Sequence, residues 1–306
     1  MGLTSTHWGT YQPKVEQGRI TDMLPFSEDG DPSDIGKGFV DVLDAPSRIT
    51  APMVRKGWLE RKGLVPSGQR GSDSFVEVDW QTALDLVAGE LGRVRDDYGN
   101  QAIFAGCYGW ASAGRFHHAQ SQIHRFLNCF GGYTKSVNTY SFAAAEVIVP
   151  HVLGDFRGFI YNQTSWESII AEGSLFVGFG GVPLKNGQIN QGGTGKHIQK
   201  ERLLQAKQAG IDFINVSPLQ EDMLADIDAE WMAIRPNTDT AFILGLCYVL
   251  LDEGLHNTDF LARHCTGFDR FADYLLGRTD NIAKTPAWAA RICGLTETAI
   301  IELGRK

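Results

Sequence analysis

Three polar side chains in the first half of the chain have the types and spacing of a site that orients a ligand. Tyr108 and Trp110 flank Gly109, the apolar run 102–106 precedes them, and Ser141 follows after a pair of glycines. Tyrosine and tryptophan each join an aromatic ring to a hydrogen-bonding group, and tryptophan can only donate. A serine oxygen is a hard ligand, which suits a high-valent oxophilic metal. Core packing for the two aromatic residues and helix capping for Ser141 are the structural alternatives.

A second group of candidate residues follows apolar runs in the second half. Glycines come directly after the run 174–178, and a Ser-Pro pair comes shortly after the run 211–215. A glycine loop after a buried strand lets a pyrophosphate approach the backbone, and a nearby lysine can stabilise negative charge. The candidate cofactor-binding residues here are Gly178, Gly180, Lys185, Ser217, Pro218, Thr238 and Asp239. The alternatives are an exposed loop lysine at Lys185 and helix capping at Thr238 or Asp239.

The intervening residues predict the elements that position both groups. In the first half, the apolar residues of a helix fall at helical spacing: Ile123, Phe126, Leu127 and Phe130. Gly131 ends this helix, so a strand leads to Tyr108 and Trp110 and a glycine-rich return presents Ser141. In the second half, strand 174–178, a helix from about 197 to 209 and strand 211–215 predict a right-handed parallel crossover. Ligands of open α/β sheets bind beyond the carboxyl ends of such strands.

The start of the chain predicts a different layer. Residues 1–62 are polar and rich in turns, which indicates a small antiparallel sheet. Asp79 is expected to cap a helix with a buried apolar stripe, formed by Leu84, Val87, Leu91 and Val94. Thr285 followed by Pro286 predicts another helix start.

The predicted fold class is therefore α/β, with an N-terminal antiparallel β layer followed by Rossmann-like parallel α/β units. We expect residues 1–62 to form the β-rich layer. Residues 63–160 would form an α/β segment that carries the loops of Tyr108 and Ser141. Residues 161–306 would form a Rossmann-like dinucleotide-binding segment.

Composition narrows the range of partners. The net charge of −8 over 306 residues argues against nucleic acid and against an anionic membrane surface as partners. No apolar run approaches the roughly 20 residues of a membrane helix, and the first residues do not have the pattern of a signal peptide. The five cysteines form no C-x-x-C pair, which favours reduced thiols in a cytoplasmic protein.

Taken together, the motifs resemble the dimethyl sulfoxide reductase family of molybdopterin oxidoreductases, most nearly its biotin sulfoxide and trimethylamine N-oxide reductase branches. The resemblance extends over nearly the whole chain, through Tyr108-Gly109-Trp110, Gly131-Gly132, Tyr140-Ser141, His7-Trp8-Gly9, Pro52 to Lys56, Gln163 to Trp166, Thr238-Asp239 and Leu275 to Gly277. It implies that Ser141 ligates molybdenum through its oxygen. It also implies that Trp110 hydrogen-bonds the oxo group on the metal and that Tyr108 faces the substrate oxygen.

The resemblance also implies a cofactor, molybdenum with bis(molybdopterin guanine dinucleotide). Lys185 would lie near the pterin, and Asp239 would meet guanine. The chain departs from the family at Ser217 and Gln220, where an aspartate and an arginine are usual, which weakens the case for a phosphate contact there. No cysteine precedes Cys107, so we expect no iron–sulfur cluster.

The implied reaction is oxygen-atom transfer, the reduction of a small-molecule S-oxide or N-oxide with electrons from a donor that the sequence does not identify. Family members are much longer, so we expect their C-terminal domains to be absent and the 306-residue chain alone to lack activity. The alternative is a non-catalytic fragment that binds a nucleotide-like cofactor without metal. A nicotinamide dehydrogenase is disfavoured, because no G-x-G-x-x-G opens a helix after a strand.

Overall fold

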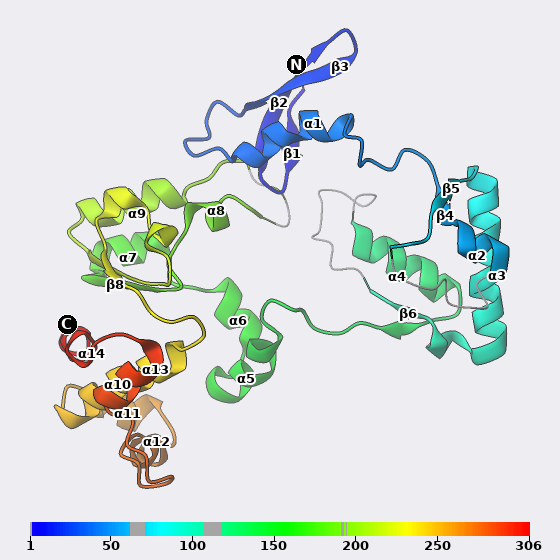
Figure 1. Ribbon diagram of the computed structural model, residues 1–306. Coiled ribbons are helices and arrows are strands. Elements are labelled where there is room, and N and C mark those ends of the chain that lie inside the picture. Colours follow the sequence, from blue (N-terminus) through cyan, green and yellow to red (C-terminus); the bar gives the residue numbers. More distant parts are fainter. Residues whose placement is uncertain (1, 62–70, 107–117, 191–192, 194) are drawn as a thin grey trace. The chain divides into compact units, whose positions relative to one another are not determined.

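The structure is a computed structural model that describes residues 2–61, 71–106, 118–190, 193 and 195–306 (Figure 1). The chain divides into two compact units. Unit 1 comprises residues 1–162 and 189–196, and unit 2 comprises residues 163–188 and 197–306. The three-segment division expected from the sequence stays a prediction.

Unit 1 begins with an antiparallel sheet of β1 (Thr4–Thr6), β2 (Gly9–Glu16) and β3 (Arg19–Pro25), in that order. Tyr11 of β2 is 1% exposed, and its hydroxyl donates to the carbonyl of Ser33 at 2.8 Å. This bond satisfies the polar group of a buried side chain. The short helices η1 (Asp34–Gly38) and α1 (Phe39–Leu43) follow. The predicted N-terminal antiparallel layer is therefore confirmed.

The next part of unit 1 pairs β4 (Met53–Arg55) with β5 (Phe75–Glu77) in antiparallel fashion; α2 (Lys56–Arg61) follows β4, and α3 (Trp80–Tyr98) follows β5. The Asp79 carboxylate accepts from the amide of Thr82 at 2.7 Å, so the predicted N-cap is confirmed. The stripe expected to be buried is not. No residue of α3 is buried, and Leu84 and Val87 are 58% and 59% exposed.

Two short strands and three helices complete the described part of unit 1. β6 (Phe104–Ala105) and β7 (Thr134–Lys135) pair in parallel, after η2 (Asn100–Ala102). The helices are α4 (Ala119–Cys129), α5 (Ala143–Leu153) and α6 (Phe156–Tyr161).

Unit 2 is built on a parallel sheet of three strands in the order β10-β9-β8. The strands are β8 (Leu175–Phe179), β9 (Asp212–Val216) and β10 (Glu230–Met232). Between β8 and β9 lie α8 (Leu184–Gly187) and α9 (Gln199–Gln208), which makes the predicted strand–helix–strand unit. The α/β fold class is confirmed.

Helices cover both faces of this sheet, so β9 is buried on both sides. Ile214 and Val216 pack into one cluster with Phe242 of α10 and Ile300 of α14. Phe213 packs into the other cluster, with residues of α9 and partly buried residues of α7 (Trp166–Glu172). Successive side chains of a strand point to opposite faces, which explains how Phe213 and Ile214 enter different clusters.

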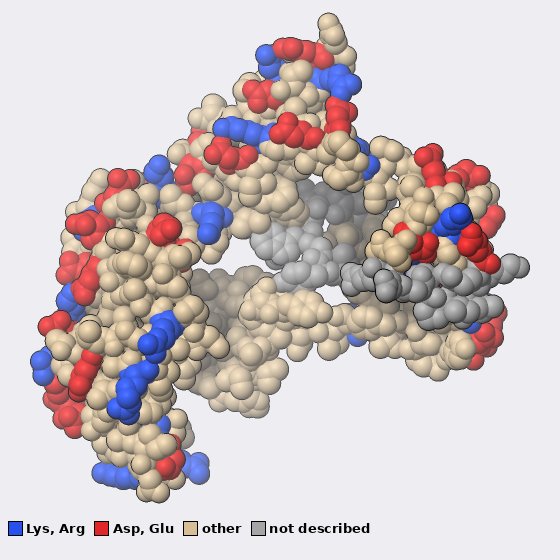
Figure 2. Space-filling model, viewed as in Figure 1, with Lys and Arg blue, Asp and Glu red and all other residues tan. Residues whose placement is uncertain are grey.

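The remaining helices follow β10. They are α10 (Asp239–Asp252), α11 (Thr258–His264), α12 (Phe268–Leu275), α13 (Pro286–Cys293) and α14 (Glu297–Arg305). Thr285 caps α13 by accepting from the amide of Trp288 at 3.1 Å, as predicted. Among the described residues, no helix combines the length and apolar character needed to cross a membrane. Acidic and basic side chains are interspersed over the visible face of unit 2 (Figure 2).

The core of unit 2 should be sensitive to truncation at Phe242, which is fully buried beside the sheet. Phe242→Ala should lower the free energy of unfolding by about 3–5 kcal/mol, because it removes buried apolar surface and leaves a cavity. Denaturant unfolding measures this change. The matched control is Phe260→Ala, at a side chain that is 51% exposed; it should cost no more than about 1 kcal/mol. Equal losses in the two variants would contradict the described core.

Candidate cofactor site

Two chain segments that carry candidate residues leave the same edge of the short parallel sheet in unit 1. Phe104 pairs with Thr134, and the amide of Ser136 donates to the carbonyl of Ala105 at 3.3 Å. A Cβ at Gly106 would lie 2.7 Å from the Cβ of Ser136, so only glycine allows this approach. The segment that leads toward Tyr108 and the segment that leads toward Ser141 therefore start side by side.

Ser141 lies in an exposed turn directly before α5. The N-cap of α5 is Phe142, which makes no side-chain cap hydrogen bond. The amide of Ser141 donates to the hydroxyl of Thr139 at 3.4 Å. Capping of α5, the structural alternative for Ser141, is therefore not what the structure shows. Tyr108 and Trp110 lie outside the described residues.

In unit 2, Gly180 and Ser217 lie just beyond the carboxyl ends of β8 and β9. The amide of Gly180, just after β8, donates to the carbonyl of Val216 at 2.8 Å. Gly181 has φ +73°, and a Cβ there would lie 2.5 Å from both the Cβ and the carbonyl oxygen of Asp222. Beside Gly180, in contrast, an added Cβ would meet no atom within 4 Å. The backbone at Gly180 is thus open to close approach, whereas Gly181 is locked against the neighbouring loop.

Ser217, after β9, is fully buried and bonded within the protein. Its hydroxyl donates to the Asp222 carboxylate at 2.6 Å and accepts from the amide of Leu219 at 3.2 Å. Its carbonyl accepts from the indole N–H of Trp231 at 2.8 Å. These bonds hold the loop after β9 in one shape, so Ser217 acts on that loop rather than presenting its hydroxyl outward. Pro218, the next residue, is exposed.

The remaining candidate cofactor-binding residues differ in their exposure and in their hydrogen bonds. Lys185, on α8, is exposed and forms no ion pair with the described residues. Thr238 is the N-cap residue of α10, but its hydroxyl donates to the carbonyl of Arg235 at 2.6 Å and does not cap the helix. Asp239 is half-buried in the first turn of α10, where a carboxylate is favoured by the helix dipole. Gly178 is buried within β8.

The structure therefore brings together the loops after β8 and β9, and the chain after β10 leads to the start of α10. Sequence reasoning missed two residues of this edge, Gly181 and Asp222. The carboxylate of Asp222 accepts from the Ser217 hydroxyl, so it is committed to the loop. The available signal was a serine at a strand end with a carboxylate shortly after it, a common way to close a turn.

Comparison with known proteins decides the family. The family model for molybdopterin oxidoreductase matches residues 48–306. The model for the molybdopterin oxidoreductase N-terminal domain matches residues 4–44, which contain the antiparallel sheet. The chain belongs to the molybdopterin oxidoreductase family. Membership implies a molybdenum–pterin cofactor.

Individual relatives agree with this assignment. The dimethyl sulfoxide/trimethylamine N-oxide reductase of Cereibacter sphaeroides is 39% identical over 99% of this chain and 37% of its own length. The biotin sulfoxide reductase of the same organism is 42% identical over 90% of this chain and 37% of its own length. The trimethylamine-N-oxide reductase of Haemophilus influenzae is 37% identical over 98% of this chain and 36% of its own length. The chain thus spans little more than a third of the length of these relatives.

A solved structure supports the same fold. Acetylene hydratase from Pelobacter acetylenicus superposes with a TM-score of 0.57 at 19% identity, over 99% of this chain and 38% of that one. At this identity the likeness concerns the fold alone.

The described residues of this molybdopterin oxidoreductase fit such a cofactor. Gly180 leaves open space at the carboxyl edge, and Lys185 offers an unpaired cation within the described structure. Ser141 supplies a hard oxygen donor outside the helix that follows it.

The two glycines after β8 give a matched test of this loop. Gly180→Ala should cost about 1–2 kcal/mol of unfolding free energy, because its φ of +79° disfavours a side chain although space is available. Gly181→Ala should cost about 1–3 kcal/mol more, because its Cβ also meets Asp222. Denaturant unfolding of both variants measures the difference. Equal costs would show that the close approach to Asp222 does not constrain the loop.

Proposed function

We propose that the whole protein reduces S-oxides or N-oxides of small molecules by oxygen-atom transfer. The observation that carries this proposal is the match to reductases of dimethyl sulfoxide, trimethylamine N-oxide and biotin sulfoxide, one of them at 39% identity across 99% of the chain. The substrate is a small molecule of the type that those names state. The electrons come from a donor protein or reductant.

The proposed cofactor is molybdenum with two molybdopterin guanine dinucleotides, without an iron–sulfur cluster. When bound, it supplies the two-electron chemistry that side chains cannot. The open backbone at Gly180 and the cation of Lys185 would hold one dinucleotide at the carboxyl edge of unit 2. Asp239, at the start of α10, would accept hydrogen bonds from the base. Ser217 would act indirectly, by fixing the loop through Asp222.

Three residues of unit 1 would act at the reacting atoms. Ser141 is the proposed protein ligand of the metal. Its exposed position before α5 supports this role, since its place in the chain is not that of a helix cap. Trp110 would donate a hydrogen bond, and Tyr108 would orient the substrate oxygen. The shared edge of β6 and β7 supports a common site for these residues, because both segments leave from that edge.

The ligand assignment can be tested in the whole protein, purified from a molybdenum-replete host. Ser141→Ala should remove one oxygen scatterer from the metal environment seen by X-ray absorption, because alanine has no donor atom. Ser136→Ala is the control, at an exposed serine on the same return; it should leave the spectrum unchanged. An identical metal environment in wild type and Ser141→Ala would remove Ser141 from the ligand set.

The role of Tyr108 predicts a kinetic effect. Tyr108→Phe should lower kcat/KM for a sulfoxide by about 5- to 150-fold, the worth of a hydrogen bond of roughly 1–3 kcal/mol. Steady-state kinetics with a reduced viologen as donor measure it. Tyr161→Phe, at a side chain that is 75% exposed, should leave kcat/KM unchanged. If Tyr108→Phe matches the wild type, Tyr108 does not contact the substrate.

A further inference from the structure

In the described part of unit 2 the parallel sheet has two open edges, β8 and β10, and they differ in character. β8 is five residues long, reads Leu-Phe-Val-Gly-Phe and pairs with β9 without a bulge. β10 is three residues long and carries Glu230, which forms an ion pair with Lys306 at 2.8 Å. Short length, charge, proline and bulges are the usual features that keep an exposed edge from pairing with another strand. The edge of β8 has none of these features.

The hydrogen bonds to β9 show which backbone groups of β8 face its open edge. The carbonyl of Ser174 accepts from the amide of Asp212 at 2.9 Å, and the amide of Gly180 donates to the carbonyl of Val216 at 2.8 Å. Alternate residues of a strand in a parallel ladder direct both backbone groups to the same side, so the even-numbered residues face β9. Three residues direct their N–H and C=O groups to the open edge, where the described chain supplies no backbone partner: Leu175, Val177 and Phe179.

The burial of the two strands agrees with an uncovered edge at β8. On β9, the four residues from 213 to 216 are buried. On β8 only Gly178 is buried, and the side chain of Phe179 is 44% exposed. Strands of parallel sheets are normally covered by neighbouring elements. A further strand beside β8 would cover these side chains and pair with its outward row of backbone groups.

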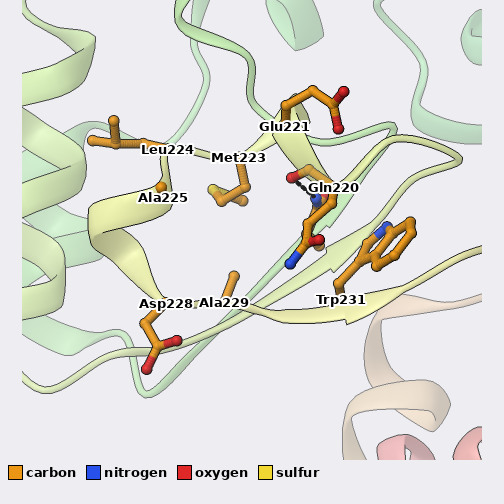
Figure 3. Close-up of a pocket in the computed structure, with 9 residues that line it drawn as sticks. Gln220, Glu221, Met223, Leu224, Ala225, Asp228, Ala229 and Trp231 are labelled. Carbon is orange, nitrogen blue, oxygen red and sulfur yellow. Dashed lines mark hydrogen bonds between the residues drawn. The ribbon is translucent and has the colours of Figure 1, made fainter.

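The helices lie on the two faces of the sheet in a definite order along the chain. α9 and the crossover from β9 to β10 pack on one face, through Leu203 and Ile227. A pocket of about 310 Å³ opens beside this crossover (Figure 3). α10, α13 and α14 pack on the other face, through Phe242, Ala289 and Ile300. The chain therefore changes face after β10.

This change of face determines which edge the next parallel strand joins. Crossovers between parallel strands of one sheet are nearly always right-handed. Two crossovers of the same hand that use opposite faces must run in opposite directions across the sheet. The crossovers on the α9 face run from β8 to β9 and from β9 to β10. A crossover through α10 to α14, on the opposite face, therefore returns toward β8 and does not continue past β10.

We propose that the open edge of β8 is an interaction surface for a fourth parallel strand, contributed by the chain that follows α14 in the whole protein. The chain described here spans little more than a third of the length of its relatives, so such a segment is available. The added strand places Gly180 where the strand order reverses, which is where open α/β sheets bind ligands. The inference does not rest on the proposed reaction.

Hydrogen exchange of the whole protein, read at single residues by mass spectrometry with electron-transfer fragmentation, tests the pairing. The amide of Val177 should exchange within about tenfold of the rate of Gly178, because both then lie in a ladder. The control is the amide of Trp231, which faces the open edge of β10, since the Met232 carbonyl accepts from the amide of Ser217 on β9. It should exchange at least about 100-fold faster than Val177. If Val177 exchanges at least about 100-fold faster than Gly178, β8 is an open edge and the proposal fails.

A photo-cross-linker in the whole protein identifies the occupant. p-Benzoylphenylalanine in place of Phe179 should form an adduct with residues after 306 of the same chain. The same replacement at Trp231, a 41% exposed side chain on the other edge, is the control and should give no adduct with that segment. A mixture of ¹⁴N- and ¹⁵N-labelled protein distinguishes adducts within one chain from those between two.

Three results of the cross-linking would overturn the proposal. Adducts of position 179 that join two chains would make the occupant a second copy. Adducts confined to residues 1–306 would show that no later segment reaches this edge. The same adducts from positions 179 and 231 would show a segment packed over the sheet and not paired with β8.

Discussion

The burial of β9 on both faces is the constraint on which unit 2 depends. Ile214 and Val216 point into one apolar cluster and Phe213 into the other, so a shift of one residue would exchange the two sets. Parallel pairing with β8 and β10 then fixes where all three strands end. The apolar contacts of the strands thus set where the loops at that edge begin, and the loop after β9 adds Met223 and Ile227 to one of the clusters.

Once the strand ends are fixed, the polar groups of the loops beyond them must find hydrogen-bond partners. In the loop after β9 these groups are satisfied internally, because the Ser217 hydroxyl donates to the Asp222 carboxylate and accepts from the amide of Leu219. The loop after β8 packs against the loop after β9, where Gly181 closely approaches Asp222. The position of Gly181, and with it the neighbouring Gly180, therefore depends on a serine–aspartate pair in a different loop.

The sequence was sufficient for features set by local chemistry. Apolar runs predicted β8 and β9, and capping side chains predicted the helices after Asp79 and Thr285. The sequence was not sufficient where a side chain packs or bonds with a partner that is distant in the chain, or where several partners are available. The stripe of α3 has helical spacing but is not buried, since spacing does not say what packs against it. For Ser141 the sequence left helix capping open as an alternative, and the backbone places Phe142 at the cap.

The connection from β9 to β10 has an unusual form for parallel neighbours. Such crossovers commonly lay a full helix across the sheet, but residues 217–229 make only two single turns, η4 (Gln220–Asp222) and η5 (Ala225–Ile227). Because Met223 and Ile227 anchor this segment in the core, its exposed positions can diverge without disturbing strand register. The exposed positions of this crossover can therefore vary in sequence while the three strands keep their register.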